Sequence, residues 1–250
     1  MISKAIIKKI HSLEQRKYRL KEQLFVAEGP KLVGELCATM KPVYLAALPA
    51  WIADNQSLAD SVEHDVVSPD ELRRTSLLCQ PQQVVALFPI PQRTLSPETL
   101  DGQLSLMLDC VQDPGNLGTI IRLADWFGIR HVVCSPDTAD IYNPKATQAT
   151  MGALARVEVH YCSLPSILAH TSLPVFGTFL DGDNIYQRPL SPHGIVIMGN
   201  EGRGISPEVE SFVSERLFIP NYPLGAVTTE SLNVAIATSI VCAEFRRRSL

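Results

Sequence analysis

The sequence predicts an α/β protein of two domains, and two observations support this prediction. Short apolar segments typical of buried strands alternate with helical segments along the chain of 250 residues. A proline-rich run, Phe88–Pro97, interrupts the alternation and suits a linker, because proline breaks both helices and central strands. We therefore expect a small α/β domain over residues 1–92, a linker over 93–102 and a larger α/β domain over 103–250.

The elements of the first domain follow from local patterns. A basic helical stretch opens the chain, followed by a strand at Leu24–Ala27 and a helix that begins at Gly29-Pro30. Strands are also expected at Val43–Leu48 and Val84–Phe88. A helix between them begins after Ser68, since Ser68-Pro69-Asp70-Glu71 is typical of an N-cap with proline at the first helical position.

The second domain shows the same alternation more clearly. Strands are predicted at Leu104–Leu108, His131–Cys134, Val157–His160, Val175–Leu180, Ile195–Met198 and Leu217–Ile219. Helices are expected between most of these strands, which predicts a mostly parallel sheet covered on both faces. Ligands of such sheets bind in the loops at the carboxyl ends of the strands, so candidate functional residues are sought there.

Charge distribution distinguishes the two domains. The formal net charge is -4, which argues against a protein that binds nucleic acid by overall basicity. However, residues 1–31 hold eight Lys or Arg against three Glu. The positive charge is therefore concentrated at the N-terminus.

Missing features exclude several classes of protein. The longest stretch without a charged residue, between Glu158 and Asp181, contains two prolines and suits no membrane span. The N-terminus lacks the apolar core of a signal peptide, so we expect a cytoplasmic protein. The six cysteines form no C-x-x-C pair, and no motif groups histidines with carboxylates, so no metal is expected. The G-x-G at Gly202–Gly204 comes too late for a usual Rossmann site, and no P-loop is present.

Three loops that follow predicted strands carry the functional signal. In the first, Asn116 and Gly118 open a helix and Arg122 lies on its second turn. An asparagine N-cap, a turn glycine and a solvated arginine would explain the same residues. The second loop, residues 198–206, contains three glycines and Glu201. A simple turn into a helix capped at Ser206 would explain only the end of this loop and not its glycines or Glu201.

The third loop runs from residue 218 into the last helix. Ser231 or Thr229 could cap this helix. Asn233 is unexpected at the start of an otherwise apolar helix, because it would be a buried amide, which must find hydrogen-bond partners.

Taken in order, the three loops resemble the motifs of the SpoU or TrmH-like RNA methyltransferases of the SPOUT class. The elements that match are N-x-G-x-x-x-R (Asn116, Gly118, Arg122), G-N-E-G-x-G (Gly199–Gly204) and an I-P pair followed by S-L-N-V-A (Ile219-Pro220 and Ser231–Ala235). The resemblance covers residues 104–245. The ten residues 221–230 within the third element make it longer than the commonest spacing in the family.

The resemblance implies a fold and an activity. The fold would be an α/β SPOUT domain whose parallel sheet ends in a deep trefoil knot, preceded by a smaller α/β RNA-binding domain. The enzyme would be a homodimer that uses S-adenosyl-L-methionine to methylate a ribose 2'-hydroxyl of rRNA or tRNA. The alternatives are a noncatalytic RNA-binding or ribosome-assembly protein that has kept the fold, and methylation of a base.

The resemblance also implies roles for individual residues. Arg122 would lie at the 2'-hydroxyl, with Asn116, Glu201, Ser231 and Asn233 ordering it, the RNA backbone and the cofactor. The cofactor would contact residues around Thr178, Leu180, Gly199, Ile219 and Leu232, each of which ordinary core or turn packing would also explain. A free arginine is a poor base, since its pKa is above about 12, so we expect Arg122 chiefly to position the nucleotide.

The N-terminal part is similar to the small RNA-binding domain of many family members. The similarity rests on Arg16-Lys17 and on Phe25–Gly29 before a helix. We expect Arg16, Lys17 and Arg19 to contact RNA phosphates, although a basic solvated helix face would show the same pattern.

Overall fold

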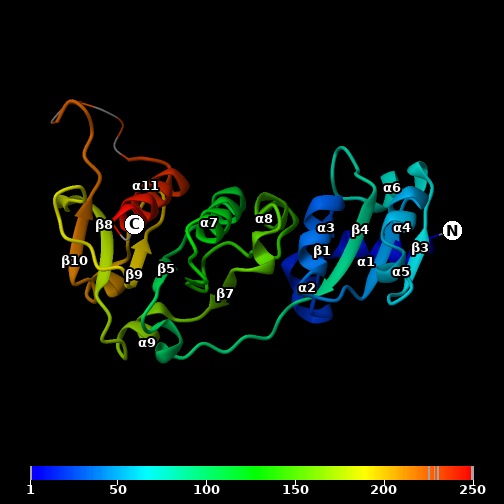
Figure 1. The fold of residues 1–250 in the computed structure, drawn as a ribbon, viewed down its shortest axis with the longest axis horizontal. Helices are drawn as coiled ribbons and strands as arrows, with labels where there is room; N and C mark the ends of the chain where they lie inside the picture. Colours follow the sequence, from blue (N-terminus) through cyan, green and yellow to red (C-terminus); the bar gives the residue numbers. More distant parts are fainter. Residues whose placement is uncertain (1, 225, 228, 230, 249–250) are drawn as a thin grey trace. The chain divides into compact units, whose positions relative to one another are not determined.

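The computed structural model describes residues 2–224, 226–227, 229 and 231–248 (Figure 1). The chain divides into two compact units, one of residues 1–92 and 140–155, the other of residues 93–139 and 156–250. We call them unit 1 and unit 2. Residues 140–155, which the sequence analysis assigned to the second domain, thus belong to unit 1.

Unit 1 is built on a sheet of four strands in the order β1-β4-β2-β3. Its elements are α1 (Lys4–Ser12), α2 (Arg16–Glu22), β1 (Leu24–Glu28), α3 (Pro30–Cys37), β2 (Tyr44–Ala47), α4 (Pro49–Asp54), α5 (Gln56–Ala59), β3 (His64–Val66), α6 (Pro69–Thr75), β4 (Val84–Pro89), α8 (Pro144–Ala149) and the 3-10 helix η2 (Ala153–Ala155). Strand β4 is antiparallel to β1 and β2, whereas β3 is parallel to β2. The short strand β3 was not predicted, since its three residues are not buried and lack an apolar run.

The predicted cap of α6 is confirmed in detail. The Ser68 hydroxyl accepts a hydrogen bond from the Glu71 backbone N–H, and the Glu71 carboxylate accepts one from the Ser68 N–H. This reciprocal pair satisfies two backbone donors that the first turn would otherwise leave free.

Arg19 is a structural residue of unit 1. Its side chain is 2% exposed, and its guanidinium donates to Asp140 Oδ2 at 2.6 and 2.9 Å. It also donates to the carbonyl oxygens of Leu13 and Glu14, both at 2.7 Å. A guanidinium held by these acceptors is not exposed to phosphates, so the structure contradicts the expectation that Arg19 contacts RNA.

Unit 2 is built on a six-stranded, entirely parallel sheet in the order β10-β8-β9-β5-β6-β7. Its elements are η1 (Pro97–Leu100), β5 (Leu104–Leu108), α7 (Pro114–Trp126), β6 (His131–Cys134), β7 (Glu158–Tyr161), α9 (Leu164–Leu168), β8 (Val175–Asn184), β9 (Gly194–Met198), α10 (Pro207–Glu210), β10 (Glu215–Phe218) and α11 (Val234–Arg247). The predicted parallel sheet is confirmed, and strand β8 extends four residues beyond the prediction.

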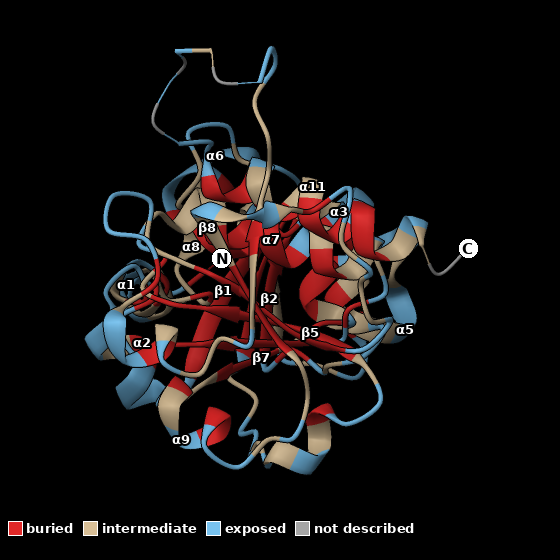
Figure 2. Cartoon of the chain, turned by 90° about the vertical axis from the view of Figure 1, so that its left-hand side faces the viewer, coloured by how far each residue is buried: buried red, intermediate tan, exposed pale blue. Residues whose placement is uncertain are grey.

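Helices cover both faces of the unit 2 sheet. Helices α7 and α11 pack against each other on one face, and α9, which contacts α10, lies on the opposite face (Figure 2). Figure 2 shows buried residues gathered on the strands, and β5 and β9 are buried along their whole length. Among the described residues, no helix is long and apolar enough to cross a membrane.

Candidate active site

The glycine-rich loop after β9 is a tightly built turn. The backbones of Asn200 and Gly204 exchange two hydrogen bonds of 2.9 Å, and Asn200 Oδ1 accepts from the N–H groups of Gly202 and Arg203 at 3.0 Å. A Cβ at Gly199 would lie 2.3 Å from the carbonyl carbon of Gly204, a distance that side chains do not tolerate. Glycine is therefore required at residue 199 for the loop to close on itself.

The loop is also fixed to the strand beside it. Asp109, buried just after β5, accepts a hydrogen bond from the Ser206 N–H at 2.7 Å. Asn200 Nδ2 donates to the Cys110 carbonyl oxygen at 2.8 Å. Since β5 and β9 are neighbours, these bonds hold the loops after the two strands together.

The N-cap of α7 is Asp113, and not Asn116 as one reading of the sequence would have it. Asp113 Oδ1 accepts from the Asn116 backbone N–H at 2.8 Å, which satisfies a donor of the first turn. Asn116 is therefore inside the helix, and its side-chain amide is available for other partners.

Asn233 is the N-cap of α11, a position that the sequence analysis gave to Ser231 or Thr229. Its Oδ1 accepts from the N–H groups of Ala235 and Ile236 at 2.9 and 3.3 Å. The side chain is exposed, so it is not the buried amide that the pattern suggested. Capping explains why an asparagine begins this apolar helix.

Two hydrogen bonds join the three sequence motifs. Asn233 Nδ2 donates to Asn116 Oδ1 at 3.0 Å, and Asn116 Nδ2 donates to Glu201 Oε1 at 2.9 Å. The three residues come from the start of α11, from α7 and from the loop after β9. In the sequence, Asn233 lies 117 residues and Glu201 lies 85 residues from Asn116. Three of the five residues predicted to act together are thus joined by hydrogen bonds, whereas, in the part of the chain that the structure describes, Arg122 and Ser231 have no bond to them.

A pocket of about 520 Å³ lies beside these hydrogen-bonded residues. All five residues expected to contact a cofactor line it, as do two of the expected catalytic residues: Thr178, Leu180, Gly199, Ile219 and Leu232, with Glu201 and Ser231. The volume lies within the range of about 300–1,000 Å³ typical of small-molecule sites. The roles of these residues remain predictions.

Asn116, Arg122 and Asn233 do not line the pocket. Arg122 is exposed on α7, and among the described residues it has no hydrogen bond or ion pair. Its guanidinium is therefore free to bind a ligand from outside its own chain.

Arg216 supports one wall of the pocket, and no sequence pattern predicted it. Its guanidinium lies 3.6 Å from the ring centroid of Phe179 and donates to Asp181 and Glu210, each at 2.5 Å. Phe179 and Glu210 both line the pocket. The hydrogen bonds to Asp181 and Glu210 raise the pKa of Arg216, and the bond from Arg216 lowers the pKa of Asp181. Arg216 has no neighbouring motif that could have identified it.

Two family models match the chain. The SpoU rRNA Methylase family matches residues 103–243, which is more than half of the chain. The MRM3-like substrate binding domain matches residues 4–86. Among curated proteins, the 23S rRNA (guanosine(2553)-2'-O)-methyltransferase RlmP of Bacillus subtilis (strain 168) is 32% identical over 243 residues, which cover 96% of this chain and 94% of that protein.

Solved structures agree over the full length. A protein of the TrmH family from Porphyromonas gingivalis superposes with a TM-score of 0.89, at 43% identity and 99% coverage of both chains. An AdoMet-bound rRNA methyltransferase from Sinorhizobium meliloti superposes with a TM-score of 0.87, at 28% identity, covering 100% of this chain and 97% of that one.

Proposed function

The chain belongs to the SpoU rRNA Methylase family and is an RNA methyltransferase with the SPOUT α/β fold, and on this premise we propose that it methylates a ribose 2'-hydroxyl of rRNA or tRNA. The observation that best supports the proposal is the hydrogen-bonded series Asn233, Asn116 and Glu201, of which Glu201 lines the pocket. The name of the Bacillus subtilis relative favours rRNA and the 2'-oxygen. A protein that only bound RNA would have no need of this arrangement.

The pocket suits S-adenosylmethionine, the cofactor present in the Sinorhizobium meliloti structure. The apolar side chains of Leu180, Ile219 and Leu232 would hold its uncharged parts, and backbone groups at Gly199 would approach it closely. Glu201 places a negative charge on the lining that would attract the cationic sulfonium, whereas the charge of Glu210 is balanced by Arg216. When bound, the cofactor supplies a methyl group already activated by the sulfonium.

With an activated donor, the protein has to align the nucleophile. We assign Arg122 to the nucleotide, where its planar fork can bind the phosphate next to the reacting ribose with two hydrogen bonds. Glu201 is oriented by Asn116, which is in turn held by Asn233. Arg122→Lys keeps the charge but not the fork, so the rate should fall strongly; a rate near wild type would contradict this role.

We also propose that the enzyme is a homodimer in which Arg122 serves the pocket of its partner. Arg122 is exposed and does not line its own pocket. Large apolar side chains are exposed on the same pair of helices, with Trp126 on α7 84% exposed and Ile236 on α11 54% exposed. A second copy that covered these side chains would bury apolar surface and supply the missing arginine.

Mixing two inactive variants tests this arrangement. Arg122→Ala keeps an intact pocket, and Thr178→Trp blocks the pocket but keeps Arg122. If Arg122 acts across the dimer, mixed dimers contain one complete site and activity returns on mixing. If activity stays absent in mixtures shown by mass spectrometry to contain mixed dimers, Arg122 acts within its own chain or elsewhere.

Unit 1 would bind the RNA, as its match to a substrate-binding domain suggests. Arg16 and Lys17 are exposed on α2 and remain in the proposal, while Arg19 does not. Replacing both with alanine should weaken binding and reduce the slope of log K against log salt by about 1 to 2. An unchanged slope would show that α2 does not contact phosphates.

The reaction itself is tested by methylating unmodified total RNA with labelled S-adenosylmethionine. Digestion to nucleosides should release label on the ribose, and mapping would identify the nucleotide. Label on the base would contradict the 2'-hydroxyl as acceptor. The absence of both transfer and cofactor binding would favour the noncatalytic alternative.

A further inference from the structure

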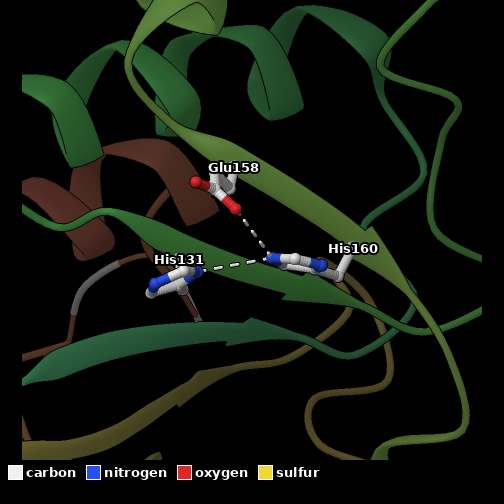
Figure 3. Close-up of side chains that lie close together, drawn as sticks. All are labelled: His131, Glu158 and His160. Atoms are coloured by element: carbon white, nitrogen blue, oxygen red, sulfur yellow. Dashed lines mark hydrogen bonds and ion pairs between the residues drawn. The ribbon is translucent and has the colours of Figure 1, made fainter. Parts of the chain in front are cut away.

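Three potential metal ligands meet near one edge of the unit 2 sheet. His131 begins β6, while Glu158 and His160 lie on the edge strand β7. One ligand atom from each residue lies within 4.8 Å of the other two. Figure 3 shows the two imidazoles and the carboxylate turned toward one another. None of the three lines the pocket.

Strand register explains why these residues meet. Glu158 and His160 are two apart and therefore share one face of β7. His131 is the parallel partner of Glu158, which places its side chain on that same face. The sequence alone could not reveal the cluster, because 27 and 29 residues separate its members and only the pairing of β6 with β7 joins them.

The distances suit a tetrahedral ion. His131 Nδ1 lies 3.3 Å from His160 Nε2. Two nitrogens that each bind zinc at about 2.0–2.1 Å with a tetrahedral angle would be about 3.3–3.4 Å apart. Glu158 Oε2 lies 3.9 Å from His160 Nε2, so closing the site requires this distance to shorten by about 0.6 Å.

We propose that His131, Glu158 and His160 bind a divalent transition-metal ion of the zinc type, with water as the fourth ligand. Two imidazoles and one carboxylate form a donor set that zinc accepts. The histidines are 5% exposed, so the ion would be shielded, and it would tie the edge strand β7 to β6. Ligation at Nε2 would fix the proton of His160 on Nδ1, an atom that is buried without a hydrogen-bond partner among the described residues.

Two arginines would influence the affinity of this cluster for a metal ion. Arg93 donates to Glu158 Oε2 at 2.8 Å, and Arg130 donates to Oε1 at 2.9 Å. A carboxylate has lone pairs for both arginines and an ion, and such hydrogen bonds orient metal-bound carboxylates. The positive charges nevertheless repel a cation. The side chain of Arg130 is 67% exposed, so it can be replaced with little risk to the fold.

The experiment uses the full-length chain, freed of any purification tag, with its zinc content measured after dialysis against zinc and then metal-free buffer. We expect about one ion per wild-type chain, and a loss of it in His160→Ala and in His131→Gln. His193→Ala, which removes an exposed histidine elsewhere in unit 2, is the matched control and should retain the ion. Circular dichroism checks that each variant is folded.

Two further measurements identify the ligands. Cobalt(II) should give the intense visible bands of a tetrahedral site without a sulfur-to-metal charge-transfer band, which excludes the free cysteines. Arg130→Met should tighten zinc binding about threefold to tenfold, because it removes a nearby positive charge and leaves all three ligands. The proposal is overturned if the wild type takes up no zinc or if cobalt binds through sulfur. It is also overturned if the variant that lacks both His131 and His160 takes up as much zinc as the wild type.

Discussion

The side-chain amide of Asn233 has two separate tasks at the candidate site. Its oxygen caps α11, and its nitrogen donates to Asn116, which in turn donates to Glu201. The two ends of one amide thus connect the start of a helix to a predicted catalytic carboxylate. A substitution that keeps the cap and removes the nitrogen can separate these tasks.

Asn233→Ser is the first prediction. Serine caps a helix about as well as asparagine, so the free energy of unfolding should stay within about 0.5 kcal/mol of wild type. The lost donor to Asn116 should lower the methylation rate about fivefold to tenfold. Asn233→Ala should show the same loss of rate and also lose about 1 kcal/mol of stability in urea unfolding. Wild-type activity of the serine variant would show that the bond to Asn116 has no part in catalysis.

At the scale of elements, a cluster of charges stabilises the end of α11. Glu244 is 5% exposed and accepts hydrogen bonds from Arg247 at 2.8 and 2.9 Å and from Arg248 at 2.7 Å. The bond from Arg247 is the main reason why the pKa of Glu244 falls to about 2, and Arg248 adds to it against the opposing effect of burial.

The second prediction is a pH dependence. A carboxylate whose pKa is lowered on folding stabilises the folded state above its unfolded pKa of 4.5, and this contribution is lost as the pH falls toward 2. Glu244→Gln should therefore lower the free energy of unfolding by about 1–2 kcal/mol at pH 7. This value is reduced because Arg247 is exposed to solvent. The difference in free energy of unfolding between the variant and wild type should become smaller below pH 4.5. Urea unfolding at several pH values measures this. Glu208→Gln, at an exposed site, should change the free energy of unfolding little at any pH. If the difference between Glu244→Gln and wild type does not depend on pH, the Glu244 carboxylate is not the source of the stabilisation.

The third prediction concerns Arg216 on β10, which braces Phe179 and Glu210. Arg216→Met keeps an apolar contact with the ring and removes both ion pairs. The pocket wall should loosen, so KM for S-adenosylmethionine should rise about threefold to tenfold while kcat changes little. A change confined to kcat would show that Arg216 acts elsewhere than on the pocket wall.

Local patterns predicted most elements because their signals are local. The apolar runs of β5 and β6 and the cap of α6 depend on neighbouring residues, and each was predicted at its observed place. The cap of α11 was misplaced, because Thr229, Ser231 and Asn233 are all acceptable caps and only tertiary contacts select one. The structural contacts of Arg216 and Arg19 were missed for a similar reason. Asp140, the partner of Arg19, and Asp181, a partner of Arg216, are distant in the sequence, and no sequence motif marks Glu210 as the second partner of Arg216.

At the scale of the whole molecule, unit 1 is completed by a segment from later in the chain. Residues 140–155 supply α8, which packs against β1, and Asp140, which holds Arg19. The ring of Tyr142 lies 4.9 Å from that of Phe25. The first ninety-two residues alone would therefore leave a nearly buried guanidinium without its carboxylate.

The fourth prediction follows from this completion. Arg19→Met leaves Asp140 and two carbonyl oxygens without their donor, so unit 1 should lose about 3–5 kcal/mol in urea unfolding. Arg16→Met, on the exposed side of α2, should change stability by less than about 0.5 kcal/mol. Equal stability of the two variants would show that the pair with Asp140 contributes little.

The late origin of residues 140–155 has a consequence for synthesis on the ribosome. A nascent chain that has reached residue 92 must be extended by 63 more residues before the last part of unit 1 has been made. At about 5–20 residues per second this takes about 3–13 s, during which the apolar surface of β1 that α8 will cover lacks its cover. Translation speed over this interval, and chaperones that bind exposed apolar surface, should therefore influence the yield of folded enzyme.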